Sequence, residues 1–500
     1  MYDHLEVEKK WHKYWADHET FKTDVWDFSK PKFYALDMFP YPSGVGLHAG
    51  HPEGYTATDI VSRMKRMQGY NVLHPMGYDS FGLPAEQYAV QTGNNPNGFT
   101  QKNIKTFTKQ LQELGFDYDW SKMIATSDPE FYHWTQWIFK QLYKDGYAKY
   151  VDMPVNWCEE LGTVLSNDEV IDGKSERGGY PVIRKNMKQL CIDQAAFAER
   201  LLEGLNEIDW PESTKEMQRN WIGRSTGVEV QFEIVGGGKF SIFTTCIETI
   251  YGITFMVLAP DGDLVQELMP RIKNQDEVKA YIQETVSKSE MDRTELNKGK
   301  SGCRLEGIKA INPVNGKEVE VFIGDFVLAN YGTGAVMAVP SHDQRDFEYA
   351  IAHNIDMIQV IEGQDVSEHA FEKQDYLGKG CKLINSEEFT GLTVEEAKVA
   401  ITKKLVDMGI AKETVNYRFR EWIFARQRYW GEPVPIVHLE DGTDYVLPDE
   451  ELPLILPELE DYKGHNGKAP LENATEWKQY NKCPESKEYM NTCLLQSMLI

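Results

Sequence analysis

The chain has 500 residues, a length that corresponds to about three domains of ordinary size. Hydrophobic residues make up 41% of it and charged residues 26%, a composition that excludes a disordered chain. Acidic residues outnumber basic ones by 78 to 53, which gives a net charge of −25. Any nucleic-acid partner must therefore be met by local basic groups and not by the surface as a whole.

Seven scattered cysteines include no C-x-x-C pair, so we expect neither a disulfide framework nor a thiolate zinc site. No apolar run approaches the roughly 18 residues that a membrane span requires. The N-terminus, MYDHLEVEKKWHKYW, lacks the apolar core of a signal peptide and the acid-free character of a transit peptide. We therefore expect a cytoplasmic protein without a membrane partner.

The first elements alternate between strands and helices. Residues 32–38 (KFYALDM) predict a strand that ends at the Pro-Tyr-Pro-Ser-Gly break at 40–44. Residues 71–75 predict a second short strand. Between them a helix is expected to end before Gly69. Its apolar stripe consists of Ile60, Val61, Met64 and Met67.

Two further helices are predicted before residue 150. The second begins at residues 127–130 (SDPE), which supply a cap and a first-turn proline, and ends near Gly146. The first has its apolar positions at Ile104, Phe107, Leu111 and Leu114. Strands interleaved with helices favour an α/β fold with a doubly wound, Rossmann-like parallel sheet.

The pattern changes near residue 224. From 228 to about 340, β-branched runs alternate with glycine-rich turns, which predicts an inserted β-rich domain. A helical pattern returns at 394–405, with apolar positions at Ala397, Val399, Ile401 and Leu405. After about residue 417 the composition is again rich in aromatic residues and arginine, as in the first segment. We therefore expect one domain made of residues 1–222 and 417–500, interrupted by a second domain at 223–416.

Residues 38–51 (MFPYPSGVGLHAGH) carry the clearest chemical signal. A strand ends, a Pro/Gly turn follows, and His48 and His51 stand where a helix begins. Backbone N–H groups and the helix dipole favour anions there, and Gly50 lets a phosphate or ribose approach the backbone. Two imidazoles at that point can donate hydrogen bonds to a phosphorus centre as negative charge develops. An H-x-x-H pair alone is more often incidental or metal-binding, but no third ligand cluster lies nearby, so we expect no bound metal.

Three blocks resemble the class I aminoacyl-tRNA synthetases. Residues 39–51 resemble the HIGH signature in the form found in bacterial or organellar leucyl enzymes. Residues 77–86 (GYDSFGLPAE) are similar to the family's G-x-D-x-F-G-L-P-A-E segment, and residues 426–431 (RQRYWG) resemble the point where the catalytic fold resumes after its insertion. Isoleucyl and valyl enzymes share the fold and the insertion, but Ser43 and Phe81 favour the leucyl form.

The resemblance implies ATP-dependent ligation of leucine to tRNA(Leu) through leucyl-adenylate, by a monomer that uses Mg²⁺ and has no DNA partner. It implies catalytic roles for His48 and His51. The implied ATP-binding residues are Pro40, Tyr41, Gly44, His48, Gly50 and His51. The implied leucine-binding residues are Met38, Phe39, Tyr41 and Asp79. Asp79 would accept hydrogen bonds from the leucine ammonium group, because a buried cation must be paired.

In the inserted domain, hydroxyls and carboxylates at strand ends can hold an ester's ammonium group and position a water, although Thr in strands and Asp in turns are common for structural reasons. The resemblance implies an editing pocket here, because one methyl group is worth only about 1–3 kcal/mol in an apolar site. Asp346 would anchor the ammonium group, and Thr249 would block the leucine side chain. The implied editing residues are Thr244, Thr245, Thr249, Tyr331, Met337, Val339, Asp343, Arg345 and Asp346.

The chain departs from the family pattern in three places. The family's T-T-R-P-D-T loop reads T-T-C-I-E-T at residues 244–249, which weakens the expectation of hydrolysis. Residues 190–196 (LCIDQAA) lack an expected Trp and basic residues, and residues 481–500 do not resemble the family's continuation. We therefore expect a truncated synthetase with an aberrant tail. The alternatives are an impaired remnant that binds tRNA or leucine or only deacylates, and an isoleucyl- or valyl-tRNA synthetase.

Overall fold

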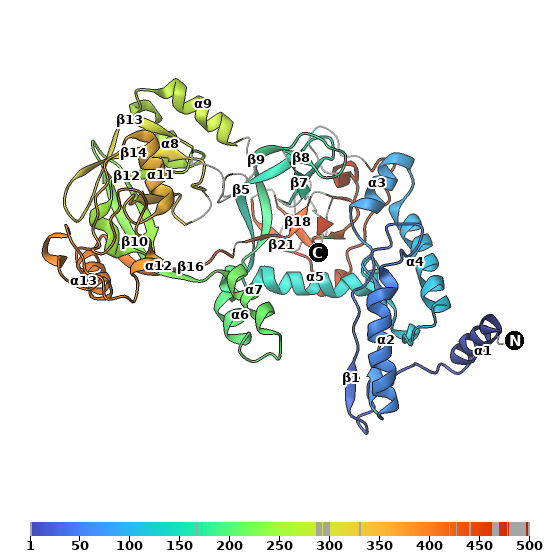
Figure 1. The fold of residues 1–500 in the computed structure, drawn as a ribbon. Coiled ribbons are helices and arrows are strands. Elements are labelled where there is room, and N and C mark those ends of the chain that lie inside the picture. The colour runs from blue at the N-terminus through green and yellow to red at the C-terminus, as the bar shows by residue number, and fades with distance from the viewer. Residues whose placement is uncertain are drawn as a thin grey trace.

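The computed structural model describes residues 3–166, 169–171, 173–286, 293, 301–329, 332–419, 421–426, 428–439, 442–462, 470–477, 479 and 497–498. Figure 1 shows two units side by side: an α/β unit that contains α2 to α5, and a β-rich unit that contains β10 to β15. Among the described residues, no helix combines the length and apolarity needed to cross a membrane.

Two short pairs of parallel strands organise the start of the α/β unit. β1 (Lys32–Tyr34) pairs with β2 (Asn71–Leu73), and β3 (Gly77–Tyr78) pairs with β4 (Ile124–Ala125). Parallel strands need a crossover connection, which helices supply in both pairs. These helices are α2 (His51–Met67), α3 (Leu83–Thr92) and α4 (Pro96–Glu113). The expected α/β class is confirmed.

Helix α2 turns its apolar stripe outward. The helix begins and ends as its sequence predicts, but Ile60, Val61, Met64 and Met67 are between 40% and 88% exposed. Its buried residues are Tyr55 and Ser62. The Ser62 hydroxyl donates to Asp117 at 2.7 Å, and Arg66 Nε donates to the same carboxylate at 3.1 Å. Polar contacts therefore fix the inner face of this helix.

The middle of the chain joins the two parts of the α/β unit. α5 (Pro129–Lys144) is followed by a long antiparallel pair, β5 (Ala148–Cys158) and β9 (Ile183–Ile192). The later segment returns to this pair, because β17 (Trp422–Ile423) pairs with β9.

The remaining elements of the unit are helices and short strands. They are α1 (His4–Asp17), η1 (Trp120–Lys122), β6 (Thr163–Leu165), β7 (Val170–Ile171), β8 (Lys174–Ser175), η3 (Ala195–Phe197), α6 (Ala198–Gly204), α7 (Glu212–Ile222), β18 (Ala425–Arg426), β19 (Glu432–Pro433), β20 (Ile436–His438), β21 (Asp444–Val446), η7 (Asp449–Glu451), η8 (Pro470–Asn473) and β22 (Ser497–Met498).

The β-rich unit is built on one seven-stranded sheet. Its order is β11-β10-β13-β14-β12-β15, and β16 pairs with the first part of β10, opposite β11. β11 also contacts β15. The sheet therefore curls round on itself. Its strands are β10 (Ser225–Ile234), β11 (Lys239–Thr244), β12 (Phe255–Leu258), β13 (Gly302–Ile311), β14 (Glu318–Gly324), β15 (Ala335–Ala338) and β16 (Ala411–Asn416). Its helices are η4 (Ile247–Gly252), α8 (Asp263–Leu268), η5 (Met269–Arg271), α9 (Gln275–Val286), α11 (Gln344–His353), α12 (Lys373–Tyr376), η6 (Glu387–Phe389) and α13 (Val394–Asp407).

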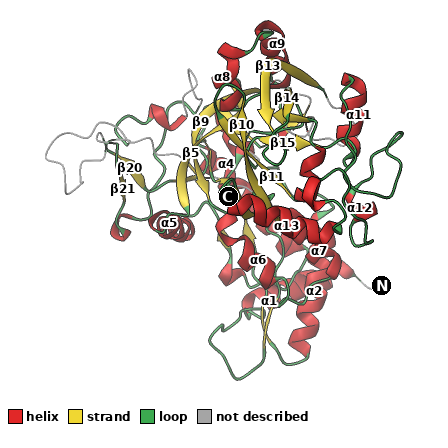
Figure 2. Ribbon diagram, turned by 90° about the vertical axis from the view of Figure 1, so that its left-hand side faces the viewer, coloured by secondary structure: helices red, strands yellow, loops and turns green. Residues whose placement is uncertain are grey.

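Helix α13 covers the outside of this sheet, against β16 and η4 (Figure 2). Its buried apolar residues are Val394, Ala397, Ile401 and Leu405. Val399, which belongs to the predicted apolar set, is 70% exposed because it falls on the opposite face of the helix.

The strands that enter and leave the β-rich unit pair with each other. β10 and β16 run antiparallel, with Ser225 opposite Asn416 and Val230 opposite Ala411. Just before them, the carbonyl oxygen of Ile222 accepts the N–H group of Arg418 at 3.1 Å. The two connections between the units therefore lie side by side.

Candidate functional site

The loop that precedes α2 is held by two side chains of α4. Asn103 Nδ2 donates to the carbonyl oxygen of Pro42 at 2.8 Å, and the N–H group of Leu47 donates to Gln110 Oε1 at 2.8 Å. A Cβ atom at Gly46 would lie 2.7 Å from Gln110 Nε2, so any larger residue would displace the side chain that holds the loop. The loop is therefore fixed on both sides of Gly44, which is itself exposed.

His48 and His51 stack at the start of α2, with ring centroids 3.8 Å apart. His51 Nδ1 accepts the N–H group of His48 at 3.2 Å, and His48 Nδ1 accepts the N–H group of Gly50 at 3.1 Å. A backbone N–H only donates, so each neutral ring carries its proton on Nε2. Burial lowers the pKa of His51, with a smaller contribution from His48. The pair thus presents two neutral Nε2–H donors at a helix N-terminus, which suits an anion.

The predicted leucine contacts differ in exposure. Met38 is 86% exposed and Tyr41 is 62% exposed, whereas Phe39 is half-buried. A Cβ atom at Gly77 would lie 2.4 Å from the Phe39 ring, so this glycine makes room for it. The Tyr55 hydroxyl donates to the carbonyl oxygen of Met38 at 3.1 Å.

Asp79 lies directly beside this loop. Its N–H group donates to the carbonyl oxygen of the buried Pro40 at 3.2 Å, and its carboxylate accepts hydrogen bonds from Thr126 Oγ1, at 3.4 Å, and from Tyr41. Burial raises the pKa of Asp79, and the charge of Asp79 in turn raises the pKa of Tyr41. The structure therefore brings Asp79 and Tyr41 together and leaves the carboxylate half-buried. Such a group gains from an ammonium partner.

A second carboxyl, which sequence reasoning missed, lies near Asp79. Glu432 on β19 is only 3% exposed. Burial raises its pKa to about 8, and the charge of Asp79 adds to the rise. The sequence gives no signal for this residue, because its proximity to Asp79 depends on how the segment after residue 417 folds back.

That segment is tied to the block at residues 77–86 by buried hydrogen bonds. Glu86 Oε2 accepts the N–H groups of Tyr429 and Trp430 at 3.0 and 2.8 Å. Trp430 Nε1 donates to the carbonyl oxygen of Ser80 at 2.9 Å. Two of the three signature blocks are therefore in direct contact.

A fully buried histidine lies behind the loop. His74 Nδ1 lies 2.6 Å from Asp117 Oδ1, and His74 Nε2 lies 3.0 Å from Asp37 Oδ2. Carboxylates only accept hydrogen bonds, so both ring nitrogens donate and the ring is an imidazolium. Burial alone would lower the pKa of His74, but the two carboxylates outweigh it and raise the pKa. Asp37 immediately precedes Met38, so this ion cluster positions the start of the loop.

Within the described part of the chain, Asp59, His74 and Asp117 form a group whose ligand atoms lie within 4.8 Å of one another. Asp59 already accepts hydrogen bonds from Arg63 Nε at 2.8 Å and from the N–H group of Asp117 at 2.7 Å. With both nitrogens of His74 donating to carboxylates, the imidazole has no lone pair for a metal. The cluster fits an ion pair better than a metal centre.

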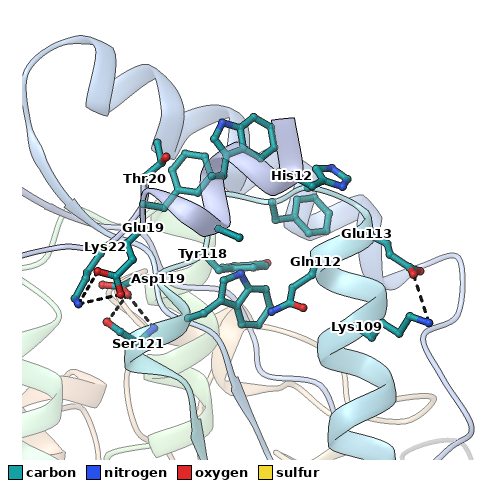
Figure 3. A pocket seen from close by; sticks show the side chains of 16 residues that line it. His12, Glu19, Thr20, Lys22, Lys109, Gln112, Glu113, Tyr118, Asp119 and Ser121 are labelled. Carbon is teal, nitrogen blue, oxygen red and sulfur yellow. Dashed lines mark hydrogen bonds and ion pairs between the residues drawn. The ribbon is translucent and has the colours of Figure 1, made fainter. Parts of the chain in front are cut away.

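A separate cavity of about 510 Å³ lies between α1, the end of α4 and η1. Figure 3 shows Tyr118 and Gln112 on its floor, with His12 above them. The Tyr118 hydroxyl donates to Asp37 Oδ2 at 2.7 Å, so the floor of this cavity touches the ion cluster behind the loop. The cavity contains none of the predicted site residues.

In the β-rich unit, the threonines of the predicted editing pocket follow β11. Thr244 ends this strand and is 9% exposed, and Thr249 lies in η4 and is 2% exposed. Thr249 Oγ1 donates to the carbonyl oxygen of Cys246 at 2.8 Å, and the N–H group of Cys246 donates to Thr244 Oγ1 at 3.0 Å. These bonds fold residues 244–249 into one compact turn that includes Thr245.

The acidic residues of the predicted pocket lie at the start of α11. Asp346 Oδ2 accepts the N–H group of Val339 at 2.9 Å, just beyond the strand that contains Met337. Asp343 caps the helix by accepting the N–H groups of Arg345 and Asp346. The Arg345 side chain is 58% exposed and lies 3.7 Å from Asp343. Tyr331 lies outside the described residues.

Three charged residues surround the Thr245 turn, and sequence reasoning missed two of them, Lys373 and Lys398. Lys398 Nζ donates to the carbonyl oxygen of Thr245 at 2.9 Å, and Lys373 Nζ reaches Thr245 Oγ1 at 3.4 Å. Glu248 is fully buried and accepts a hydrogen bond from the Tyr376 hydroxyl at 3.3 Å. Burial raises the pKa of Glu248, while the two lysines oppose the rise. Only the exchange of Asp for Glu at position 248 was visible in the sequence.

Comparisons with known proteins agree with this geometry. A model of class I tRNA synthetases (I, L, M and V) matches residues 10–297, and a model of the leucyl-tRNA synthetase editing domain matches residues 219–406. A leucyl-tRNA synthetase of Agrobacterium radiobacter K84, solved in a ternary complex with tRNA and LeuAMS, is 33% identical with a TM-score of 0.81. The match covers all of this chain and 58% of that chain. The chain belongs to the class I tRNA synthetases, and its β-rich unit is an editing domain of the leucyl-tRNA synthetase type.

Proposed function

We propose that the chain activates leucine with MgATP and transfers the leucyl group to tRNA(Leu), and that its β-rich unit hydrolyses mischarged tRNA. The observation that carries the proposal is the half-buried carboxylate of Asp79 beside the loop that ends in His48 and His51. This places an ammonium-binding group next to a phosphate-binding helix start. The match to a leucyl-type editing domain supports leucine over isoleucine and valine.

In the activation step, a carboxylate oxygen of leucine attacks the α-phosphorus of ATP. The new P–O bond forms as the bond to the β-phosphate oxygen breaks and pyrophosphate leaves. The Nε2–H groups of His48 and His51 donate to the oxygens on which charge develops, and need not lose a proton. Asp79 pairs with the ammonium group and so orients the attacking carboxylate. Mg²⁺ bound to the ATP phosphates as part of the substrate would neutralise their charge.

In the editing step, a water attacks the ester carbonyl of the aminoacyl-tRNA, and the 3′-terminal ribose oxygen leaves with a proton. Asp346 pairs with the ammonium group of the amino acid. The buried Thr249 side chain limits the space for its side chain, so smaller or differently branched residues such as norvaline and isoleucine are admitted.

Leucine-dependent exchange of pyrophosphate into ATP tests the activation step. We expect exchange with leucine but not with isoleucine or valine at equal concentration, and its loss in His48→Ala. The control variant His369→Ala, which changes an exposed histidine of the β-rich unit, should exchange as the parent does. Exchange that is absent with leucine, or that is unaffected by His48→Ala, would contradict the proposal.

A further inference from the structure

The Thr245 turn is met by two ammonium groups from distant parts of the chain. Lys373 belongs to α12 and Lys398 to α13, 128 and 153 residues from Thr245. Both side chains are half-buried, so each loses conformational entropy when it packs against the turn.

The two lysines differ in how they contact the turn. Lys398 Nζ makes a hydrogen bond of ordinary length, 2.9 Å, to the Thr245 carbonyl oxygen and so holds the backbone. Lys373 Nζ reaches only the Thr245 hydroxyl, at 3.4 Å, which is a weak contact. An ammonium group has three donors, so Lys373 keeps capacity for another acceptor.

A buried carboxylate also acts on these two lysines. Glu248 is the acidic group whose charge acts with both Lys398 and Lys373, and it is fully buried beneath the turn. Its Oε1 is held by Tyr376, and its Oε2 has no hydrogen-bond partner among the described residues. Two ammonium groups and one buried carboxylate therefore meet at this turn.

We propose that Lys373 binds the phosphodiester of the 3′-terminal nucleotide of tRNA when the aminoacyl ester lies in the editing pocket, and that Lys398 positions the Thr245 turn. This inference rests on the proposed editing function. The ester and the phosphodiester belong to one nucleotide, so an anion must lie close to any pocket that holds the ester. Lysine binds phosphate as a point charge.

The loop at residues 244–249 itself contains no lysine or arginine. Where the resembling loop T-T-R-P-D-T has an arginine, this chain has Cys246, which is uncharged as a thiol. In a chain with a net charge of −25, a local cation is needed to hold RNA. Lys373 supplies it from α12, next to the same turn.

Binding of a non-hydrolysable probe tests the proposal without requiring turnover. The probe is an acceptor-stem minihelix of tRNA(Leu) that carries norvaline through a 3′-amide, with binding followed by fluorescence anisotropy. We expect Lys373→Gln to weaken binding about tenfold, the loss of one charge-assisted hydrogen bond. Lys379→Gln changes an exposed lysine of the same segment and should bind as the parent does.

Two further results separate a phosphate contact from a structural role. The slope of log affinity against log salt should fall by about 0.7 in Lys373→Gln, as expected for one lost phosphate contact to a single strand. Adding Cys246→Arg to Lys373→Gln returns a cation to the turn and should restore most of the affinity. In deacylation of norvalyl-tRNA, Lys373→Gln should raise KM and leave kcat at saturation within about twofold.

The outcomes distinguish this inference from the proposed editing function. Unchanged probe affinity and an unchanged salt slope in Lys373→Gln would overturn the inference, whether or not the parent deacylates. Probe binding that depends on Lys373, in a parent that cleaves neither norvalyl- nor isoleucyl-tRNA, would uphold the phosphate contact and contradict the hydrolytic function. An equal loss of affinity in Lys379→Gln would show only a diffuse charge effect and would also overturn the inference.

Discussion

At the residue scale, the Asp79 carboxylate gives a direct test of the amino-acid pocket. Replacing it by alanine leaves the leucine ammonium group unpaired in a half-buried site, at a cost of roughly 3–5 kcal/mol. We expect leucine affinity to collapse in calorimetric titration, while ATP affinity changes little. Asp152→Ala, at an exposed position, serves as control. Unaltered leucine affinity in Asp79→Ala would mean that Asp79 only shapes the turn.

The buried imidazolium of His74 gives the stability of the chain a pH dependence. Its pKa is raised above the ordinary value of 6.5, so the stabilisation is fully present below about pH 6.5 and is lost as pH rises through the folded-state pKa. His74→Gln has no such titration. Thermal unfolding from about pH 6 to about pH 9 should show the parent losing its advantage over His74→Gln as pH rises. A constant difference over that range would contradict the assigned charge.

The buried Thr249 predicts a change of editing specificity. Thr249→Ala removes a methyl group and a hydroxyl from the pocket, so the variant should hydrolyse leucyl-tRNA that the parent spares. Adding Asp346→Ala should abolish this activity by removing the ammonium anchor. Thr249→Ser retains the hydroxyl that donates to the Cys246 carbonyl oxygen and separates pocket size from loop structure. If no variant cleaves leucyl- or isoleucyl-tRNA faster than buffer, the editing role is wrong.

Local sequence spacing identified the residues of the candidate site that lie close together in the chain. His48 and His51 are three residues apart at a helix start, where spacing alone fixes their proximity. The sequence gave no signal for Glu432, which lies near Asp79, or for Lys373, which contacts Thr245. In both pairs the two residues are more than a hundred positions apart in the sequence. Such contacts depend on tertiary packing, which composition and periodicity do not encode.

At the scale of elements, α2 shows that hydrophobic periodicity can predict a helix without predicting which of its faces is buried. Its predicted start at His48 and His51 and its predicted end before Gly69 are confirmed. Its apolar stripe nevertheless faces outward, because charged groups on the other face bind buried carboxylates such as Asp117. Hydrophobic periodicity assumes that the inner face is apolar, and here an ion-pair network takes that place.

The start of α13 is fixed by a capping box. Thr393 accepts the N–H group of Glu396, and the Glu396 carboxylate accepts the N–H group of Thr393. We expect Thr393→Ala to cost about 1 kcal/mol and to speed hydrogen exchange in the first turn of α13. Thr393→Ser keeps the cap and should exchange as the parent does. Equal exchange in Thr393→Ala would show that packing alone holds this end.

At the scale of the whole molecule, the main core of the β-rich unit is self-contained. All its buried residues fall between Val228 and Leu405, and β16 completes its sheet. We expect a fragment of residues 219–418 to fold alone and to unfold cooperatively in circular dichroism. A fragment of residues 225–405 lacks β16 and should melt at a lower temperature. An unstructured 219–418 fragment would show that the unit depends on the α/β unit.

The hydrogen bond between Ile222 and Arg418 has a consequence for the ancestry of the chain. The host polypeptide is interrupted at two positions that are almost 200 residues apart in sequence but 3.1 Å apart in space. Deleting everything between them leaves two ends that a short peptide can rejoin without moving any other part of the host. A gene can therefore gain, lose or exchange this segment in a single step, and the loop at residues 244–249 can diverge while the α/β unit stays unaltered.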